Sequence, residues 1–80
     1  MTPQQQQIVD LVLGVPKDQW VSFGDVSDAM NELGYGCTAR NVSNALHTFT
    51  DGYRTGRISQ ERWDEINIWG KVRNSKGHVV

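Results

Sequence analysis

Apolar residues recur every three to four positions over three stretches of the chain, a spacing that predicts three amphipathic helices. Each stretch begins at a residue typical of helix N-caps: Thr2, Ser22 and Thr38. The first two stretches stop at glycines, Gly14 and Gly34. The residues expected to face the core are Ile8, Leu11, Val12 and Val15 in the first helix, Val26, Ala29, Met30 and Leu33 in the second, and Val42, Ala45, Leu46 and Phe49 in the third.

The pattern between and after these helices is shorter and more varied. We expect a short extended piece at residues 20–21 and a loop over residues 51–57, which contain two glycines and two arginines. Ile58 and Trp63 bracket Ser59, a spacing typical of a hydrophobic staple around an N-cap. A short fourth helix is therefore predicted over the segment SQERWDEI.

The C-terminal segment has the pattern of a β-hairpin. The stretches IWGKVRN and HVV flank a turn at Ser75-Lys76-Gly77. Helices followed by a terminal hairpin make a winged helix, so we predict a mainly α fold: a single small winged helix-turn-helix domain of three to four helices plus a C-terminal β-hairpin wing. The helix-turn-helix would occupy about residues 22–49 and the wing about residues 68–80.

Charge is unevenly distributed along the 80 residues, although the formal net charge is only −1. Residues 1–32 carry one lysine against five acidic residues, whereas residues 33–80 carry seven basic residues against four acidic ones. The basic C-terminal part is suited to meeting phosphate, and an ordinary solvated surface is the other interpretation. So small a domain also needs its large apolar groups, and the three tryptophans are expected to take part in packing.

Few residues with metal or redox chemistry are present. The single Cys37 excludes an internal disulfide and suits a reducing, cytoplasmic location. Together with His47 and His78 it has no CxxC or HxxxH spacing, so neither a metal nor another cofactor is expected. The sequence also has no carboxylate pair at useful spacing, no Gly-rich phosphate loop, and no apolar stretch long enough to span a membrane.

The predicted third helix carries polar side chains opposite its apolar arc. These are Arg40, Asn44 and His47, and they are flanked by Asn41, Ser43 and Thr48. Arginine and asparagine can make paired hydrogen bonds with base edges, and serine and threonine suit phosphates. Because this helix follows another after a short glycine-containing turn, the face favours DNA reading by a helix-turn-helix, with a solvated helix face as the alternative.

Three segments, VPKDQWVSFGDVSDAM, TARNVSNAL and IWGKVRNSKG, resemble the DNA-binding domain of the alkylguanine-DNA alkyltransferases and the stand-alone alkyltransferase-like proteins. The similarity covers most of residues 3–48 and 68–78. Four residues fall in register with the family's recognition helix: Ala39, Arg40, Val42 and Ala45. The resemblance implies a winged helix-turn-helix in which Arg40 fills the gap left by a flipped base. In a plain DNA reader, Arg40 would bind a guanine edge or a phosphate instead.

The same resemblance implies that the chain is not an enzyme. Trp69 stands at the position of the family's acceptor cysteine and Gly70 at that of its histidine partner, while Lys71 replaces an arginine. A thiolate nucleophile activated by a neighbouring base cannot be assembled from tryptophan and glycine. Many alkyltransferase-like proteins also have a tryptophan at the acceptor position and bind alkylated guanine without reacting.

Other departures bear on lesion binding. Phe23 stands where the family uses a tyrosine, and Ser43 and Asn44 replace small residues that let the helix press into the minor groove. Bulkier polar side chains would obstruct that approach or change which groove is read.

We therefore expect a non-catalytic protein that binds double-stranded DNA, with helix 38–49 in a groove and the wing on the backbone. One alternative is a protein-interaction module or small phage- or mobile-element-type regulator, anchored by Tyr53, Trp63 and Trp69 if these are exposed; at least two of the three are expected in the core. The other alternative is a sensor of alkylated guanine. The predicted DNA-contacting residues are Ser22, Phe23, Thr38, Arg40, Asn41, Ser43, Asn44, His47, Trp69, Lys71, Arg73, Asn74, Ser75 and Lys76.

Overall fold

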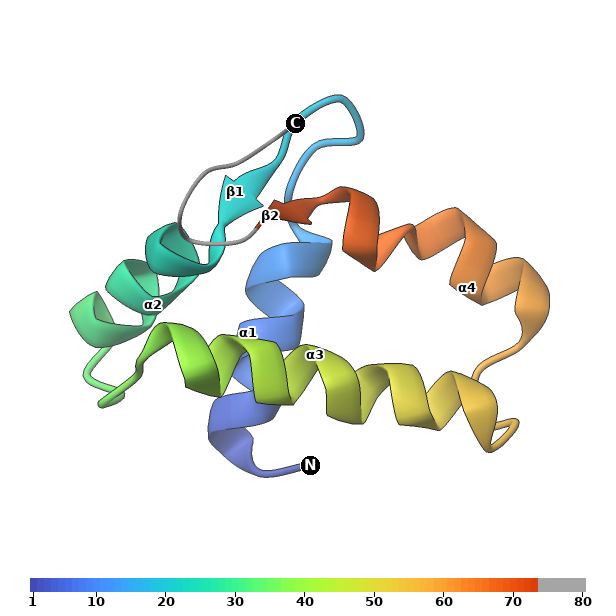
Figure 1. Cartoon of the computed structure of the whole chain (residues 1–80), viewed down its shortest axis with the longest axis horizontal. Helices are drawn as coiled ribbons and strands as arrows, with labels where there is room; N and C mark the ends of the chain where they lie inside the picture. The colour runs from blue at the N-terminus through green and yellow to red at the C-terminus, as the bar shows by residue number, and fades with distance from the viewer. Residues whose placement is uncertain (74–80) are drawn as a thin grey trace.

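The computed structural model describes residues 1–73 and confirms a mainly α fold (Figure 1). The elements in chain order are α1 (Pro3–Leu13), β1 (Val21–Ser22), α2 (Phe23–Glu32), α3 (Ala39–Arg54), α4 (Gln60–Ile66), a 3₁₀ turn (Ile68–Gly70) and β2 (Val72–Arg73). None of the helices within this range is both long and apolar enough to cross a membrane.

The four α-helices begin where their sequence signals predict. Thr2, Ser22 and Thr38 are the N-caps of α1, α2 and α3, and each forms a capping box with the residue three positions later. Ser59 caps α4, where its hydroxyl accepts a hydrogen bond from the backbone N–H of Arg62 at 3.2 Å. Such caps are local, because the side chain satisfies backbone donors one turn away.

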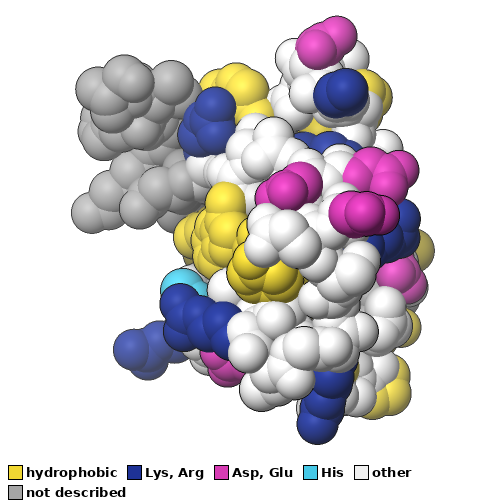
Figure 2. Space-filling view, turned by 90° about the vertical axis from the view of Figure 1, so that its right-hand side faces the viewer, with side chains coloured by type: hydrophobic (Ala, Val, Ile, Leu, Met, Phe, Trp, Pro, Cys, Tyr) yellow, Lys and Arg dark blue, Asp and Glu magenta, His cyan; other side chains and the backbone are white. Residues whose placement is uncertain are grey.

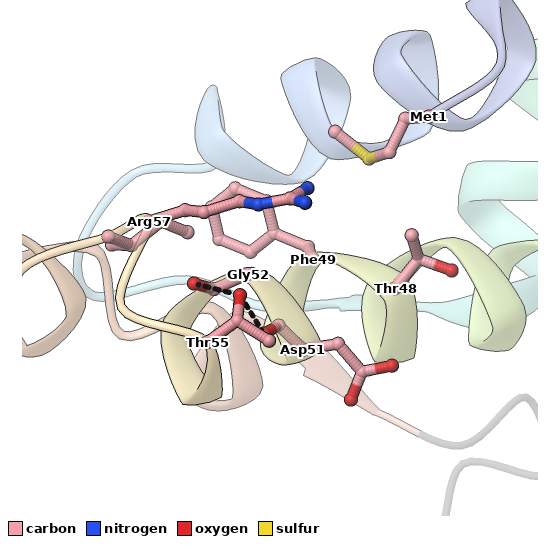
Figure 3. A pocket seen from close by; sticks show the side chains of 8 residues that line it. Met1, Thr48, Phe49, Asp51, Gly52, Thr55 and Arg57 are labelled. Atoms are coloured by element: carbon pink, nitrogen blue, oxygen red, sulfur yellow. Dashed lines mark hydrogen bonds between the residues drawn. The ribbon is translucent and has the colours of Figure 1, made fainter.

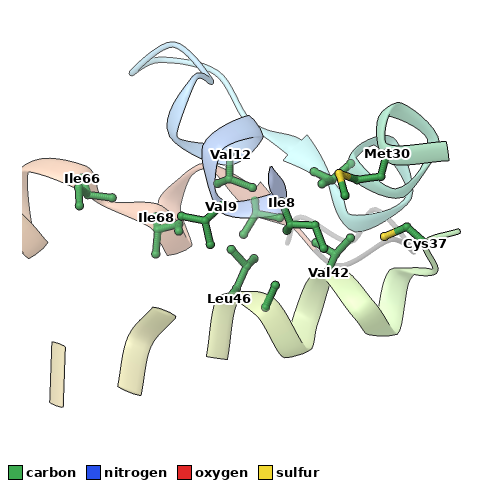
Figure 4. Close-up of a cluster of buried hydrophobic side chains, with 12 residues drawn as sticks. Ile8, Val9, Val12, Met30, Cys37, Val42, Leu46, Ile66 and Ile68 are labelled. Carbon is green, nitrogen blue, oxygen red and sulfur yellow. The ribbon is translucent and has the colours of Figure 1, made fainter. Parts of the chain in front are cut away.

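Aliphatic side chains from α1, α2 and α3 form the core, and the 3₁₀ turn closes it (Figure 4). In Figure 1, α1 crosses behind α3, and α2 lies at the N-terminal end of α3. The fully buried larger side chains are Ile8, Val9, Val12, Met30, Val42, Leu46 and Ile68. Each contributes about 1.5–3 kcal/mol through removal of apolar surface from water.

The expectation that at least two of Tyr53, Trp63 and Trp69 lie in the core is wrong, although Trp63 packs against the core from outside it. Trp20 and Trp69 are 43% and 37% exposed, and Trp63 is half-buried. Tyr53 is also half-buried, so none of the proposed aromatic anchors is a fully buried core residue. Leu33 was likewise expected in the core but is 56% exposed, because it is the C-cap of α2, where the chain turns away.

Helix α3 is longer than the apolar pattern predicts. Residues 51–54, expected in a loop, continue the helix to Arg54. The helix ends in a Schellman turn, in which the N–H of Arg57 bonds to the carbonyl of Gly52 at 2.8 Å and the N–H of Gly56 to that of Tyr53 at 3.1 Å. Gly56 takes a φ of 81°, a conformation that this turn requires and glycine adopts readily.

The predicted hairpin is wrong for the residues of its first half that the structure describes. Residues 68–70 form a 3₁₀ turn instead of a strand, and Val72–Arg73 pair in parallel with the early strand Val21–Ser22. Val21 also donates its backbone N–H to the carbonyl of Lys71 at 2.9 Å. The other half of the hairpin, residues 75–80, lies outside the described residues. The pairing fixes the segment after α4 against the segment before α2.

Candidate nucleic-acid interface

Two side chains hold the connection between α2 and α3: Asn31 through two hydrogen bonds, and Gln4 of α1, whose Nε2 donates to the carbonyl of Gly36 at 3.0 Å. The amide of Asn31 donates to the carbonyl of Cys37 at 3.0 Å and accepts from its backbone N–H at 2.9 Å. Gly34 enables the turn with a φ of 91°. Asn31 was not singled out from the sequence, although an asparagine in the last turn of a helix is a known competitor for backbone groups. This clamp positions the start of α3 relative to α2.

Cys37 is part of this turn and is only 7% exposed. Its thiol donates to the carbonyl of Thr38 at 3.5 Å, and burial raises the pKa of the thiol above its ordinary value. The cysteine therefore has the environment of a structural thiol and not of an activated nucleophile.

The predicted two-faced character of α3 is confirmed. Val42, Ala45 and Leu46 are fully buried, whereas the opposite side exposes Arg40, Asn44 and His47. The three exposed residues are spaced four and three positions apart and therefore lie along one line of the helix. We call Arg40, Asn44 and His47 the reading face.

The extra turns of α3 continue this line with two charges. Asp51 and Arg54 are both exposed and form an ion pair of 3.8 Å between Arg54 Nη1 and Asp51 Oδ1. Exposed pairs of this kind contribute little stability, but they balance charge locally. Arg54 therefore adds less positive potential than Arg40, which forms no ion pair among residues 1–73.

Trp69 lies beside the reading face. Its ring is 5.2 Å from the ring of His47 between centroids, at an angle of 50°, and its Nε1–H donates to Thr50 Oγ1 at 3.0 Å. The structure thus brings together His47 and Trp69, two of the predicted DNA-contacting residues. Thr50 was missed because nothing in its local sequence indicates a partner 19 residues away.

Gly70 is close to the side chain of Asn67. A Cβ added at position 70 would lie 2.3 Å from Asn67 Nδ2, and Asn67 itself has a left-handed φ of 47°. A larger residue at position 70 therefore requires the Asn67 side chain to move.

Arg73 in β2 and Lys71 just before β2, both predicted to contact DNA, have interaction partners within the chain. The guanidinium of Arg73 lies over the Trp20 ring at 5.5 Å from its centroid, and its Nη1 donates to the carbonyl of Gly70 at 3.4 Å. Lys71 Nζ donates to the carbonyl of Leu13 at 3.4 Å and so interacts with the C-terminal end of α1. Both side chains are half-buried.

The remaining residues predicted to contact DNA lie at or near the N-terminal ends of α2 and α3, or outside the residues that the structure describes. The side chains of Ser22, Thr38 and Asn41 take part in the capping boxes of α2 and α3. Ser43 is half-buried, and half-buried Phe23 packs against the core. The other three, Asn74, Ser75 and Lys76, lie outside residues 1–73.

Acidic side chains concentrate elsewhere on the surface. Helix α4 exposes Glu61, Asp64 and Glu65, and acidic side chains gather on the molecular face seen in Figure 2. Residues 1–73 hold no group of three or more His, Cys, Asp and Glu side chains arranged to bind a metal ion. The chain matches no protein-family model, no curated protein and no solved structure.

Proposed function

We propose that the chain is a non-catalytic protein that binds double-stranded DNA through α3, in the manner of a winged helix-turn-helix and similar to the alkyltransferase-like proteins. One observation carries the proposal: α3, which Asn31 ties to the end of α2, exposes Arg40, Asn44 and His47 opposite a fully buried stripe. A helix held in this way can present its polar line to a groove without losing its core contacts.

The dimensions and residue types of the reading face suit the major groove. Arg40 and His47 are seven residues apart, which is about 10 Å along a helix, close to the width of that groove. Arg40 can bind guanine through two hydrogen bonds and Asn44 can bind adenine in the same way. Exposed Asn44 also makes the helix surface too bulky for the close backbone approach that a minor groove requires.

The wing at about residues 68–80 belongs to this proposal. Its support among the described residues is the contact of Trp69 with His47, which places the 3₁₀ turn next to the reading face. Arg73 follows directly, and the backbone contacts proposed for Asn74, Ser75 and Lys76 continue the same segment.

The proposal is tested by fluorescence anisotropy with a labelled random duplex at low salt. Arg40→Ala should weaken binding by about 5- to 30-fold, the equivalent of one lost charged contact. The matched control is Arg62→Ala, which removes the same charge from exposed α4. Binding should also weaken steeply as salt rises, because phosphate contacts release counterions. The absence of binding, or an equal loss in both variants, would contradict a reading face on α3.

A second function, sensing of alkylated guanine, is favoured by the position of Trp69. This residue is 37% exposed and lies against the proposed recognition helix. The same titration with a duplex containing one alkylated guanine separates the two functions. Tighter binding to the lesion supports sensing, and equal affinities restrict the function to general DNA binding.

A protein partner is the remaining alternative, and exposed Trp20 and Leu33 favour it. Large apolar side chains are common anchors of protein interfaces. Capture of a partner from lysate that persists after nuclease treatment, by a chain that fails to bind duplex, would support this function over DNA binding.

A further inference from the structure

A pocket of about 500 Å³ lies on the side of α3 that contains Phe49 and Gly52 (Figure 3). Its lining is mainly apolar and includes Phe49, Ile58 and Met1. The polar residues of the lining are Thr48, Asp51, Thr55 and Arg57. A pocket of this volume, with mainly apolar walls and a small number of polar groups, is typical of sites for small molecules. None of the reading-face residues lines it, so the pocket is separate from the proposed DNA contacts.

The apolar floor of the pocket is held in place from behind. The Phe49 ring stacks on Trp63 at 6.1 Å with an angle of 28°, and Trp63 stacks in turn on Tyr53 at 4.7 Å and 7°. Gly52 leaves space beside Phe49, because it has no side chain and the nearest atom to an added Cβ would be Ile58 Cδ1 at 3.5 Å. The floor is therefore ordered before any ligand arrives.

Arg57 is placed at the pocket by the Schellman turn that ends α3. Its backbone N–H is fixed to the carbonyl of Gly52, which turns the chain back toward the helix. In Figure 3 its side chain extends in the direction of Met1, and Arg57 and Phe49 both line the pocket. The cation therefore belongs to the same pocket as the apolar floor.

No carboxylate neutralises this cation among residues 1–73, because the ion pair near the pocket joins Asp51 to Arg54 and leaves Arg57 out. Figure 3 shows the Asp51 carboxylate pointing away from the Arg57 guanidinium. The hydroxyl of Thr55 donates to backbone carbonyls of α3, so it does not compete for the guanidinium. A guanidinium that forms no ion pair within residues 1–73 and shares a pocket with an aromatic ring is complementary to an anion with an apolar body.

We propose that this pocket binds a small monocarboxylate with an aromatic or aliphatic body. The body packs on Phe49 and Ile58, and the carboxylate accepts two hydrogen bonds from Arg57. Arginine suits this role because its planar guanidinium matches the two oxygens of a carboxylate.

The test is a ¹H–¹⁵N NMR titration of the full chain with 3-phenylpropionate, compared with its uncharged analogue 3-phenylpropanamide. Saturable shifts should be confined to the amides around the pocket, Phe49, Gly52, Thr55 and Arg57, with a Kd of about 1 mM or lower, given the number of ligand atoms. The amide analogue should bind at least about tenfold more weakly, because it lacks the charge.

Arg57→Gln should weaken 3-phenylpropionate binding by about tenfold or more, and Arg62→Gln on α4 should leave it within about twofold. Both residues are exposed, and the NMR spectrum itself reports whether each variant is folded. Octanoate serves as a second probe, with an aliphatic body. Three results would overturn the proposal: neither 3-phenylpropionate nor octanoate causes saturable shifts, the amide analogue binds as tightly as 3-phenylpropionate, or the Arg57→Gln variant binds 3-phenylpropionate as tightly as the natural chain. Shifts of the same residues that depend on protein concentration alone would also overturn it, since a second copy would then occupy the pocket.

Discussion

Removal of the Asn31 clamp tests whether the α2–α3 connection depends on this side chain. Asn31→Ala removes both hydrogen bonds to Cys37, of 3.0 and 2.9 Å. The backbone of Cys37 belongs to a residue that is only 7% exposed, so its N–H and carbonyl are not readily solvated when the amide is lost.

The stability that Asn31→Ala is expected to remove can be estimated from these two hydrogen bonds. Two hydrogen bonds at about 1 kcal/mol each, with part of the penalty for a stranded buried donor, give a loss of about 2–3 kcal/mol. Alanine in place of asparagine within a helix returns about 0.6 kcal/mol. The free energy of unfolding should therefore fall by about 1.5–2.5 kcal/mol, out of a total of about 4–12 kcal/mol for a domain of this size.

Urea denaturation followed by circular dichroism measures this change. With a slope of about 1 kcal/mol per molar, the midpoint should fall by about 1.5–2.5 M. Asn44→Ala is the matched control, because Asn44 is exposed on α3 and its side chain has no hydrogen-bond partner among the described residues. It should be neutral or slightly stabilising. A loss below about 0.5 kcal/mol for Asn31→Ala, or an equal loss in both variants, would refute the clamp.

Four further tests concern three residues: Gly52, Gly70 and Cys37. Gly52→Ala should raise Tm by about 2–8 °C, because Gly52 is helical and an added Cβ meets Ile58 at an ordinary 3.5 Å; a lower Tm would contradict this. Gly70→Ala should cost about 0.5–1.5 kcal/mol in the natural chain, where it displaces the Asn67 side chain, and nothing in an Asn67→Gly background; equal costs in urea denaturation would refute the coupling. Native Cys37 should react with iodoacetamide at least about tenfold more slowly than in the urea-unfolded chain, because only the exposed thiolate reacts; equal rates would refute its burial. Its raised pKa in the folded state makes ionisation favour the unfolded chain, so stability should fall more steeply above about pH 9 in the natural chain than in Cys37→Ala.

Features that depend on a few neighbouring residues could be predicted from the sequence. The N-caps at Thr2, Ser22, Thr38 and Ser59 are correct, because each side chain satisfies donors within the same turn. The polarity of α3 is correct for a similar reason, since helical spacing alone separates its buried and exposed arcs.

Features set by distant contacts were missed. Helix α3 continues past Phe49 because the Schellman turn at Gly56 ends it later, and because Trp63 from α4 stacks on both Phe49 and Tyr53. Neither interaction appears in the periodicity of residues 38–49. The parallel pairing of Val21 with Val72 joins segments about 50 residues apart, and strands of two residues are too short for an alternating pattern.

The prediction that large aromatic side chains such as Trp63 and Trp69 lie in the core failed because size alone does not assign a residue to the core. Aliphatic stripes from three helices and Ile68 already fill the interior. Both Trp69 and Trp63 instead pack against side chains of α3 outside the core. Trp69 contacts His47, and Trp63 stacks on Phe49 and Tyr53. Tryptophan is suited to such half-exposed positions, because its indole N–H can still find a partner, as Trp69 does with Thr50.

The charge distribution around α3 restricts how DNA can approach it. In the C-terminal half of the helix, Phe49 and Tyr53 stack on Trp63 of α4, and Arg54 is paired with Asp51. Helix α4 exposes three acidic residues, Glu61, Asp64 and Glu65, against one base, Arg62. Phosphates brought close to this half would meet like charge, which disfavours an encounter more than a neutral surface does. The N-terminal half carries Arg40 without an ion pair among residues 1–73. If α3 enters a groove, the approach is therefore over Arg40 and Asn44, and the affinity lost in Arg40→Ala should exceed that lost in Arg54→Ala.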